Sequence, residues 1–227
     1  MRFVCISDTH GRHRELTLPA GDVLIHAGDF LPPGASFEAI DDFNQWLGDL
    51  PHPHKIVVAG NHDRLFEASP KQARQRLSHA IYLENSGTSI AGVRLWGCPV
   101  TPVIPEMAFA VARGAASNKF WNRIPMHTSV LITHGPPFGI LDKEHILDSH
   151  FGCEQLTKAV LRVRPQLHVF GHIHGGYGAE EGPNGTRFIN CALLNASQLR
   201  KPVVIELDAE GLSLRDNSPV DAHQGKR

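Results

Sequence analysis

The stretch that decides the fold is Arg2 to Gly11, RFVCISDTHG, in which a short apolar run is followed at once by polar turn residues. An apolar run of this length predicts a buried strand, and the residues after it predict a loop where the strand ends. The same order recurs in DVLIHA then GDF (22–30), KIVVA then GNHD (55–63), SVLI then THGPP (129–137), and LHVF then GHIHGG (167–176). We therefore expect five buried strands, each of which ends in a polar loop.

Helical patterns separate several of these strands. Ser36 to Leu50 has apolar residues at helical spacing after a capping serine, and Gly152 to Val163 is a second stretch of this kind. Alternation of strands and helices predicts an α/β domain with largely parallel central strands. Ligands of such domains gather at the carboxyl ends of the strands, which is where the polar loops lie.

The pattern changes between Ile81 and Val100, where the short runs IYLEN, TSIAG and VRLWG are separated by turn residues. This texture predicts a second, mixed or antiparallel sheet, and TRFINC (186–191) and PVVIELD (202–208) repeat it. We predict an α/β fold in which two mixed sheets pack face to face and are flanked by helices. Residues 1–227 are expected to form one domain, with a polar tail from about residue 215.

Composition excludes several classes of protein. The chain has 227 residues, 41% of them hydrophobic, and 22 Lys+Arg balance 23 Asp+Glu, which fits a globular domain without a footprint for long nucleic acid. No apolar run reaches the roughly 20 residues of a membrane span, and the chain begins with a strand pattern in place of a secretory leader. The four cysteines form no CxxC pair and are expected to be reduced. We expect a cytoplasmic protein without a membrane partner. The sequence leaves the oligomeric state open.

The chemistry is carried by carboxylates, an amide and histidines in the five polar loops. These residues are Asp8 and His10, then Asp29, then Asn61, His62 and Asp63, then His134, and finally His172 and His174. Alternate residues of an extended segment point the same way, so the D-x-H and H-x-H spacings can each aim two side chains into one cleft. Imidazole and carboxylate ligands without thiolate suit two divalent ions of Mn, Fe, Zn, Co or Ni before Mg or Ca, and we favour Mn.

Charge counting indicates the substrate class. Two divalent ions bring about four positive charges, of which Asp8, Asp29 and a bridging hydroxide would cancel three. Residual positive charge favours an anion, and paired ions both lower the pKa of a bridging water and hold the oxygens of a phosphoryl group. The sequence thus predicts phosphoester hydrolysis before peptide hydrolysis.

With these motifs the chain resembles the calcineurin-like metallophosphoesterases, whose pattern is D-x-H, G-D, G-N-H-[DE], an isolated His, and G-H-x-H. Here the motifs read Asp8-Thr9-His10, Gly28-Asp29, Gly60-Asn61-His62-Asp63, Thr133-His134-Gly135 and Gly171-His172-Ile173-His174. The resemblance runs from residue 1 to about residue 207. It implies a four-layer αββα fold.

The resemblance also implies roles for single residues. One metal would be held by Asp8, His10, Asp29 and His174, and the other by Asp29, Asn61, His134 and His172, with Asp29 as the bridge. Asn61 and His62 would bind substrate. His62 would contact the phosphate and assist the leaving oxygen, while Asp63 would orient the His62 ring.

The segments SDTHG, HAGDF, AGNHD, THGPPFGILD and RVRPQLHVFGHIHGGYG are similar to a narrower group, the small metallophosphoesterase-domain phosphodiesterases of mammalian brain and their bacterial relatives. Some members of that group carry glycine in place of the first histidine of G-H-x-H and are poor enzymes, whereas this chain keeps His172. The likeness implies a phosphodiesterase that hydrolyses small phosphodiesters, including nucleotide-type ones, by attack of a metal-bridging hydroxide.

The sequence leaves two alternatives to this function. A phosphomonoesterase or phosphoprotein phosphatase of the same superfamily would carry an arginine soon after G-D, but here Asp29 is followed by FLPPG. A non-catalytic interaction scaffold is the second alternative. Without metal, desolvation and repulsion among two buried carboxylates and four convergent imidazoles would destabilise the fold by roughly several kcal/mol. This cost disfavours the scaffold.

Five further features each have a functional and a structural interpretation. His26 could tune the bridge or be a core histidine, and Arg12 could meet phosphate or be a solvated charge. Pro136 to Phe138 could be a rigid turn or an apolar wall for a ring. Residues 107–121 could be a packing segment or a lid that contributes Arg113 or Asn118. Cys153 could have thiolate character at a helix N-terminus or be buried. In each pair the structural interpretation is preferred.

Overall fold

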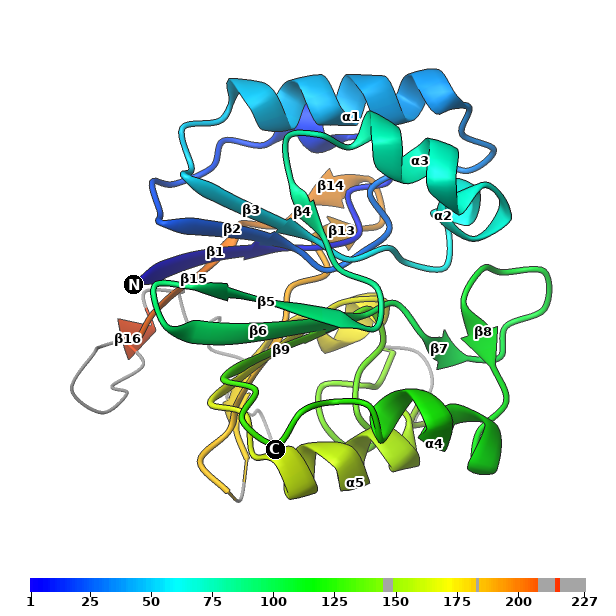
Figure 1. The fold of residues 1–227 in the computed structure, drawn as a ribbon, viewed down its shortest axis with the longest axis vertical. Helices are drawn as coiled ribbons and strands as arrows, with labels where there is room; N and C mark the ends of the chain where they lie inside the picture. The colour runs from blue at the N-terminus through cyan, green and yellow to red at the C-terminus, as the bar shows by residue number, and fades with distance from the viewer. Residues whose placement is uncertain (145–148, 183, 208–214, 217–227) are drawn as a thin grey trace, which may run out of the picture.

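A computed structural model of the chain describes residues 1–144, 149–182, 184–207 and 215–216. Two six-stranded sheets pack face to face, and helices cover the outer face of each (Figure 1). The predicted α/β fold with two mixed sheets between helices is therefore confirmed. Two further pairs of short strands, β7 (Thr101–Pro102) with β8 (Ala110–Val111) and β13 (Leu194–Asn195) with β14 (Gln198–Leu199), stand outside the main sheets.

The first sheet has the order β16-β15-β1-β2-β3-β4. Its strands are β16 (Arg215–Asp216), β15 (Val203–Glu206), β1 (Arg2–Ile6), β2 (Val23–His26), β3 (His54–Val57) and β4 (Ile81–Tyr82). The last four are parallel to one another, whereas β15 runs antiparallel to β1 and β16 antiparallel to β15. The carboxyl ends of β1, β2 and β3 consequently lie next to one another.

The second sheet has the order β11-β12-β10-β9-β6-β5. Its strands are β11 (Gly178–Glu181), β12 (Arg187–Asn190), β10 (Leu167–Phe170), β9 (Val130–Thr133), β6 (Val93–Cys98) and β5 (Ser86–Ile90). The four central strands are parallel, and the two edge strands are antiparallel to their neighbours.

The distribution of strands between the two sheets corrects the sequence interpretation. Residues 81–100 and the chain end were expected to share the second sheet, but Ile81–Tyr82 and Val203–Glu206 join the first. Strands β9 and β10, in contrast, lie in the second sheet. A strand buried on both faces has the same apolar pattern whichever sheet it joins, so the pattern identified the strands and not their partners.

Helices form the two outer layers. On the first sheet lie α1 (Phe37–Asp49), α2 (Arg64–Ala68) and α3 (Pro70–Arg76), and on the second lie α4 (Ala115–Trp121) and α5 (Glu154–Val163) (Figure 1). Short 3₁₀ turns occur at η1 (His13–Glu15) and η2 (His174–Gly176). The helices predicted at 36–50 and 152–163 are present as α1 and α5.

Burial on both faces of the strands holds the sheets together. In β1, Phe3 and Cys5 pack into the core between the sheets, while Val4 and Ile6 pack against the cluster under α1. A third cluster, which contains Leu131 and Phe170, fills the space between the second sheet and its helices. Because β1, β9 and β10 are fixed from both sides, the loops at their ends start from rigid positions.

Two expectations concern the whole chain. Within the described ranges, no helix has both the length and the apolarity needed to cross a bilayer. The polar tail was expected from about residue 215, but Arg215–Asp216 pairs with β15, and the rest of the expected tail (217–227) lies outside the described residues. The single domain over 1–227 and the cytoplasmic location stay predictions.

Candidate metal centre

The loops after β1, β2 and β3 of the first sheet meet the loops after β9 and β10 of the second. Three sets of side chains lie with their ligand atoms within 4.8 Å of one another: Asp8, His10 and His174; His10, Asp29 and His62; and Asp29, His134 and His172. These sets include six of the seven predicted ligands. The seventh, Asn61, lies with Oδ1 at 2.8 Å from Nε2 of His134. The structure thus brings all seven side chains together.

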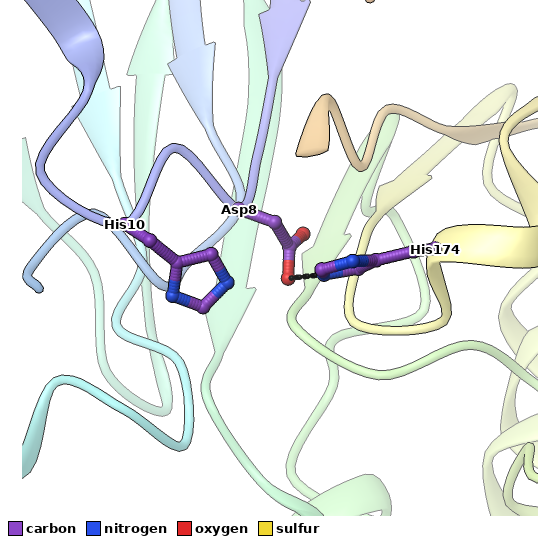
Figure 2. A group of neighbouring side chains, drawn as sticks. All are labelled: Asp8, His10 and His174. Carbon is purple, nitrogen blue, oxygen red and sulfur yellow. Dashed lines mark ion pairs between the residues drawn. The ribbon is translucent and has the colours of Figure 1, made fainter. Parts of the chain in front are cut away.

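Asp8 lies between His10 and His174, with its carboxylate directed towards the His174 ring (Figure 2). Oδ1 of Asp8 is 3.4 Å from Nε2 of His174, and Oδ2 accepts a hydrogen bond from the His172 backbone N–H at 2.9 Å. Among the described residues, Oδ1 has no hydrogen-bond partner although it is buried. A buried carboxylate oxygen without a donor is costly, and a cation would satisfy it, so this residue fits a metal site.

Asp29 occupies the middle of the cluster. Its Oδ2 is 3.3 Å from Nε2 of His134 and 3.9 Å from Nε2 of His10, while Oδ1 accepts the backbone N–H of His62 at 2.7 Å. The carboxylate is buried and has imidazoles of both sheets beside it. This is the position that a bridging ligand would need.

The hydrogen bonds of His134 define which of its nitrogens faces the cluster. Nδ1 lies 2.9 Å from the carbonyl oxygen of Ala27, which can only accept, so Nδ1 carries a hydrogen. In the neutral ring Nε2 is then the nitrogen with a lone pair, and it faces Asp29 and Asn61. Orientation of a ligand histidine by a backbone carbonyl is the usual arrangement at metal sites.

The charges of the cluster match a set of metal ligands. Burial by itself raises the pKa of Asp8 and of Asp29, but the neighbouring histidines, chiefly His174 for Asp8 and His134 for Asp29, hold both pKa values below the ordinary range. Burial lowers the pKa of His10, and it lowers the pKa of His172 to about 4. The ionised carboxylates of Asp8 and Asp29 and the neutral imidazoles of His10 and His172 are donors that transition metals prefer.

His134 and His174 differ from His10 and His172, because nearby carboxylates, chiefly Asp29 for His134 and Asp8 for His174, outweigh burial and raise the pKa of each ring. Burial alone lowers the pKa of His134, but the carboxylates of Asp29 and Asp8 raise this pKa to about 9. The metal-free site therefore stores a proton on Nε2, where a metal ion would have to bind.

Metal affinity should consequently rise with pH. Below the His134 pKa of about 9 the ion that binds His134 must displace this proton, so lowering the pH by about one unit should weaken binding of that ion about tenfold. Calorimetric titration of the metal-free protein with Mn²⁺ near pH 7 and near pH 8, in two buffers of different ionisation enthalpy, measures both the affinity and the protons released. An affinity independent of pH, with no proton release, would contradict the expectation.

The backbone at four predicted ligands is left-handed. φ is 56° at Asp8, 46° at His10, 55° at Asp29 and 70° at His172. Hydrogen bonds between the loops hold two of these residues, from the Asp8 N–H to the Gly28 carbonyl and from the His10 N–H to the Asp29 carbonyl, both at 2.9 Å. Such conformations outside glycine cost about 1–2 kcal/mol per residue and are typical of functional sites.

Gly60 gives a test of how tightly the loops fit. A Cβ at this position would meet Oδ1 of Asp29 and lie 2.7 Å from Cε1 of His134, so Gly60→Ala must displace both side chains. We expect metal affinity to fall about 10- to 100-fold, the range for residues that orient ligands. Gly135→Ala is the matched control, because its nearest neighbour is Cγ2 of Thr101 at 3.3 Å. Equal metal affinity of the two variants by calorimetry would refute the steric argument.

Asp63 has a structural role that the sequence did not indicate. Its carboxylate accepts backbone N–H groups of Asp29 at 2.8 Å, Leu31 at 2.9 Å and Gly60 at 2.7 Å, and no hydrogen bond to the His62 ring is among those of the described residues. Burial and the charge of Asp29 raise the pKa of Asp63 to about 8. Asp63 therefore braces the loop that carries Asp29, and orientation of the His62 ring by Asp63 stays a prediction. Its position at the end of G-N-H-D gave no signal of this role.

His26 follows the structural interpretation. It is fully buried, its Nδ1 accepts the Gly28 N–H at 3.3 Å, and Nε2 lies 3.0 Å from the Thr9 hydroxyl oxygen. Burial lowers the His26 pKa to about 3. It is a satisfied core histidine that also joins the loops of Asp8 and Asp29.

The remaining features follow the structural interpretations. Arg12 forms an exposed ion pair with Glu15 at 2.6 Å, and Cys153 is buried. Phe138 lines a groove beside α5, and none of the described residues that line this groove is a candidate ligand. Residues 107–121 form β8 and α4, whose Trp121 is buried in the core.

Comparison with known proteins gives consistent matches. A sequence model described as calcineurin-like phosphoesterase matches residues 1–176. Human metallophosphoesterase domain-containing protein 1 is 39% identical over 232 residues, which cover 91% of this chain and 71% of the relative. The mouse protein of the same name matches with the same identity and coverage.

Solved structures share the fold at low sequence identity. The 5′-nucleotidase precursor of Thermus thermophilus superposes with a TM-score of 0.51 at 14% identity, over 95% of this chain and 53% of that one. NAD nucleotidase of Haemophilus influenzae gives a TM-score of 0.51 at 12% identity, over 95% of this chain and 49% of that one. At these identities the matches concern the architecture alone.

Proposed function

The chain belongs to the calcineurin-like phosphoesterase family, which confirms the resemblance seen in its motifs, and on this premise we propose that it is a phosphodiesterase. It would use two divalent metal ions to hydrolyse small phosphodiesters, including nucleotide-type ones. The observation that carries this proposal is the convergence of seven oxygen and nitrogen ligands from five loops of two sheets.

The seven ligands would form two sets that share Asp29. One ion would be held by Asp8, His10, Asp29 and His174, and the other by Asp29, Asn61, His134 and His172. When bound, two such ions supply a water of lowered pKa and positive charge that holds the oxygens of a phosphoryl group. Nitrogen and oxygen donors without thiolate favour Mn, Fe, Zn, Co or Ni, and Mn is the ion we would supply first.

His62 is the candidate for proton transfer to the leaving oxygen. Its backbone N–H is held by Asp29, its ring is 4.9 Å from the ring of His10, and the side chain is only partly buried. No hydrogen bond of the ring occurs among the described residues, so the imidazole is available to a substrate. A positioned histidine of this kind contributes about 10²- to 10⁴-fold to rate.

Charge supports a diester before a monoester. With two ions, two carboxylates and a hydroxide the centre keeps about one positive charge, which a singly charged diester balances. The residues after Asp29 supply no cation, because Phe30 and Leu31 are buried in the core. Arg12 and Arg113 already pair with Glu15 and Glu154. A phosphomonoester would bring a second negative charge without a counter-charge from these arginines.

Hydrolysis of bis(p-nitrophenyl) phosphate beside p-nitrophenyl phosphate tests the proposal. With added Mn²⁺ we expect the diester to be cleaved with the higher kcat/KM. Preference for the monoester would favour the phosphatase alternative, and no cleavage of either with Mn, Fe, Zn, Co or Ni would reject the enzyme. Comparison of 2′,3′-cyclic, 3′,5′-cyclic and linear nucleotide diesters then identifies the substrate class.

A further inference from the structure

A pocket of about 370 Å³ lies directly beside the candidate metal centre and shares His172 with it. Its other walls come from three segments: Pro102 at the end of β7 with Val103 and Ile104 after it, Ala112 and Arg113 after β8, and Phe151 before α5. Pairing of β7 with β8 joins the segments that carry Pro102 and Ala112. The volume lies in the range of about 300–1,000 Å³ that is common for small-molecule sites.

The walls of this pocket are apolar. Val103 is 56% exposed, which is unusual for a large aliphatic side chain beside a polar centre. Arg113, the one cation among the described residues that line the pocket, is turned away to the carbonyl oxygens of Gly152 and Phe151 and to the Glu154 carboxylate at 2.7 Å. The charge of Arg113 is therefore already balanced, and the pocket suits an uncharged, apolar group in place of a second phosphate.

We propose that this pocket binds an aromatic ring carried by one ester oxygen of the substrate, while the phosphoryl group lies at the candidate metal centre. The inference rests on the proposed function for the phosphoryl half and on the pocket alone for the ring. Phe151 offers a ring for stacking, and Val103 and Ile104 offer aliphatic surface that the ring would remove from water. Because His172 belongs to both sites, a short ester can extend from one into the other.

Binding of phosphate monoesters measures the pocket without turnover. Calorimetry on the Mn²⁺-loaded protein should show phenyl phosphate binding about tenfold or more tightly than methyl phosphate, from burial of the ring. Adenosine 5′-monophosphate against ribose 5-phosphate repeats the comparison for a nucleobase. Preference for the ring in either pair supports the proposal and shows which kind of ring it accepts, and absence of both preferences overturns it.

Variants locate the preference in the molecule. Phe151→Ala, and separately Val103→Ser with Ile104→Ser, should reduce the preference for the ring to within about twofold of none, with methyl phosphate affinity unchanged. Phe138→Ala is the matched control, because Phe138 is 40% exposed and lines the groove beside α5. The proposal is wrong if all variants keep the wild-type preference, or if Phe138→Ala loses it as fully as Phe151→Ala.

The two proposals fail in different ways. If the protein prefers phenyl phosphate but cleaves no diester, the proposed pocket is supported and the proposed function is wrong. If the protein cleaves diesters but shows no preference for a ring, the proposed function is supported and the proposed pocket is wrong.

Discussion

Asp29→Asn should abolish phosphodiester hydrolysis and leave fewer than two metal ions per chain. Asparagine keeps the shape of Asp29 and an oxygen for the His62 N–H, but it removes the charge that lies 3.3 Å from His134 and 3.9 Å from His10. Loss of one partner from a buried charge cluster costs about 3–5 kcal/mol, which corresponds to about two to four orders of magnitude in affinity. Because Asp29 belongs to both proposed ligand sets, both ions should be weakened.

Metal content by mass spectrometry of the purified variant measures this directly. Asp142→Asn is the control, since Asp142 is also buried but bonds the loop residues Gly139, Gly152 and His150 away from the cluster. We expect Asp142→Asn to keep both ions. If Asp29→Asn also keeps two tightly bound ions, Asp29 is not the bridge.

His62→Ala should keep both ions and lose about 10²- to 10⁴-fold in kcat. The backbone N–H that bonds Asp29 remains after the substitution, so the bridge position should not change. The ring itself lies close enough to His10 and Asp29 to be a ligand, and this is the competing interpretation. Retention of metal together with loss of rate would separate a proton donor from a ligand.

The leaving group provides the second readout for His62. A proton donor matters most for a poor leaving group, so the defect should be large for an alkyl ester and small for p-nitrophenolate. His127→Ala, at an exposed histidine, should have wild-type rates on both substrates. Loss of an ion from His62→Ala would make His62 a ligand and refute the proposed role.

The positions of the candidate ligands were predictable because each depends on local pattern. An apolar run ended by Asp, Asn or His places that side chain at a strand end, and parallel strands share one edge. Asp63 was not predictable in the same way, because its carboxylate bonds backbone N–H groups of Asp29 and Leu31, which are 34 and 32 residues away in the chain. Backbone donors are present at every residue other than proline and leave no mark in the sequence.

Allocation of strands to sheets and the shape of the pocket were also hidden from the sequence. Val203–Glu206 has the residue pattern expected of strands in the second sheet, yet it pairs with β1. Long-range strand pairing depends on topology and not on local pattern. The pocket joins residues near 103 and near 151 to His172, and the apolar residues Val103, Ile104 and Phe151 stand in no motif.

The left-handed backbone at four residues, Asp8, His10, Asp29 and His172, positions metal ligands but lowers the free energy of unfolding of the metal-free protein. At about 1–2 kcal/mol each, these four residues use a sizeable part of the roughly 5–15 kcal/mol by which proteins of this size are stable. Glycine would adopt φ of 70° at position 172 without strain. Laboratory evolution for heat resistance in a chelating buffer would therefore enrich glycine there and discard the chemistry, whereas the same selection with excess Mn²⁺ would retain histidine, because binding draws the population towards the folded, loaded form.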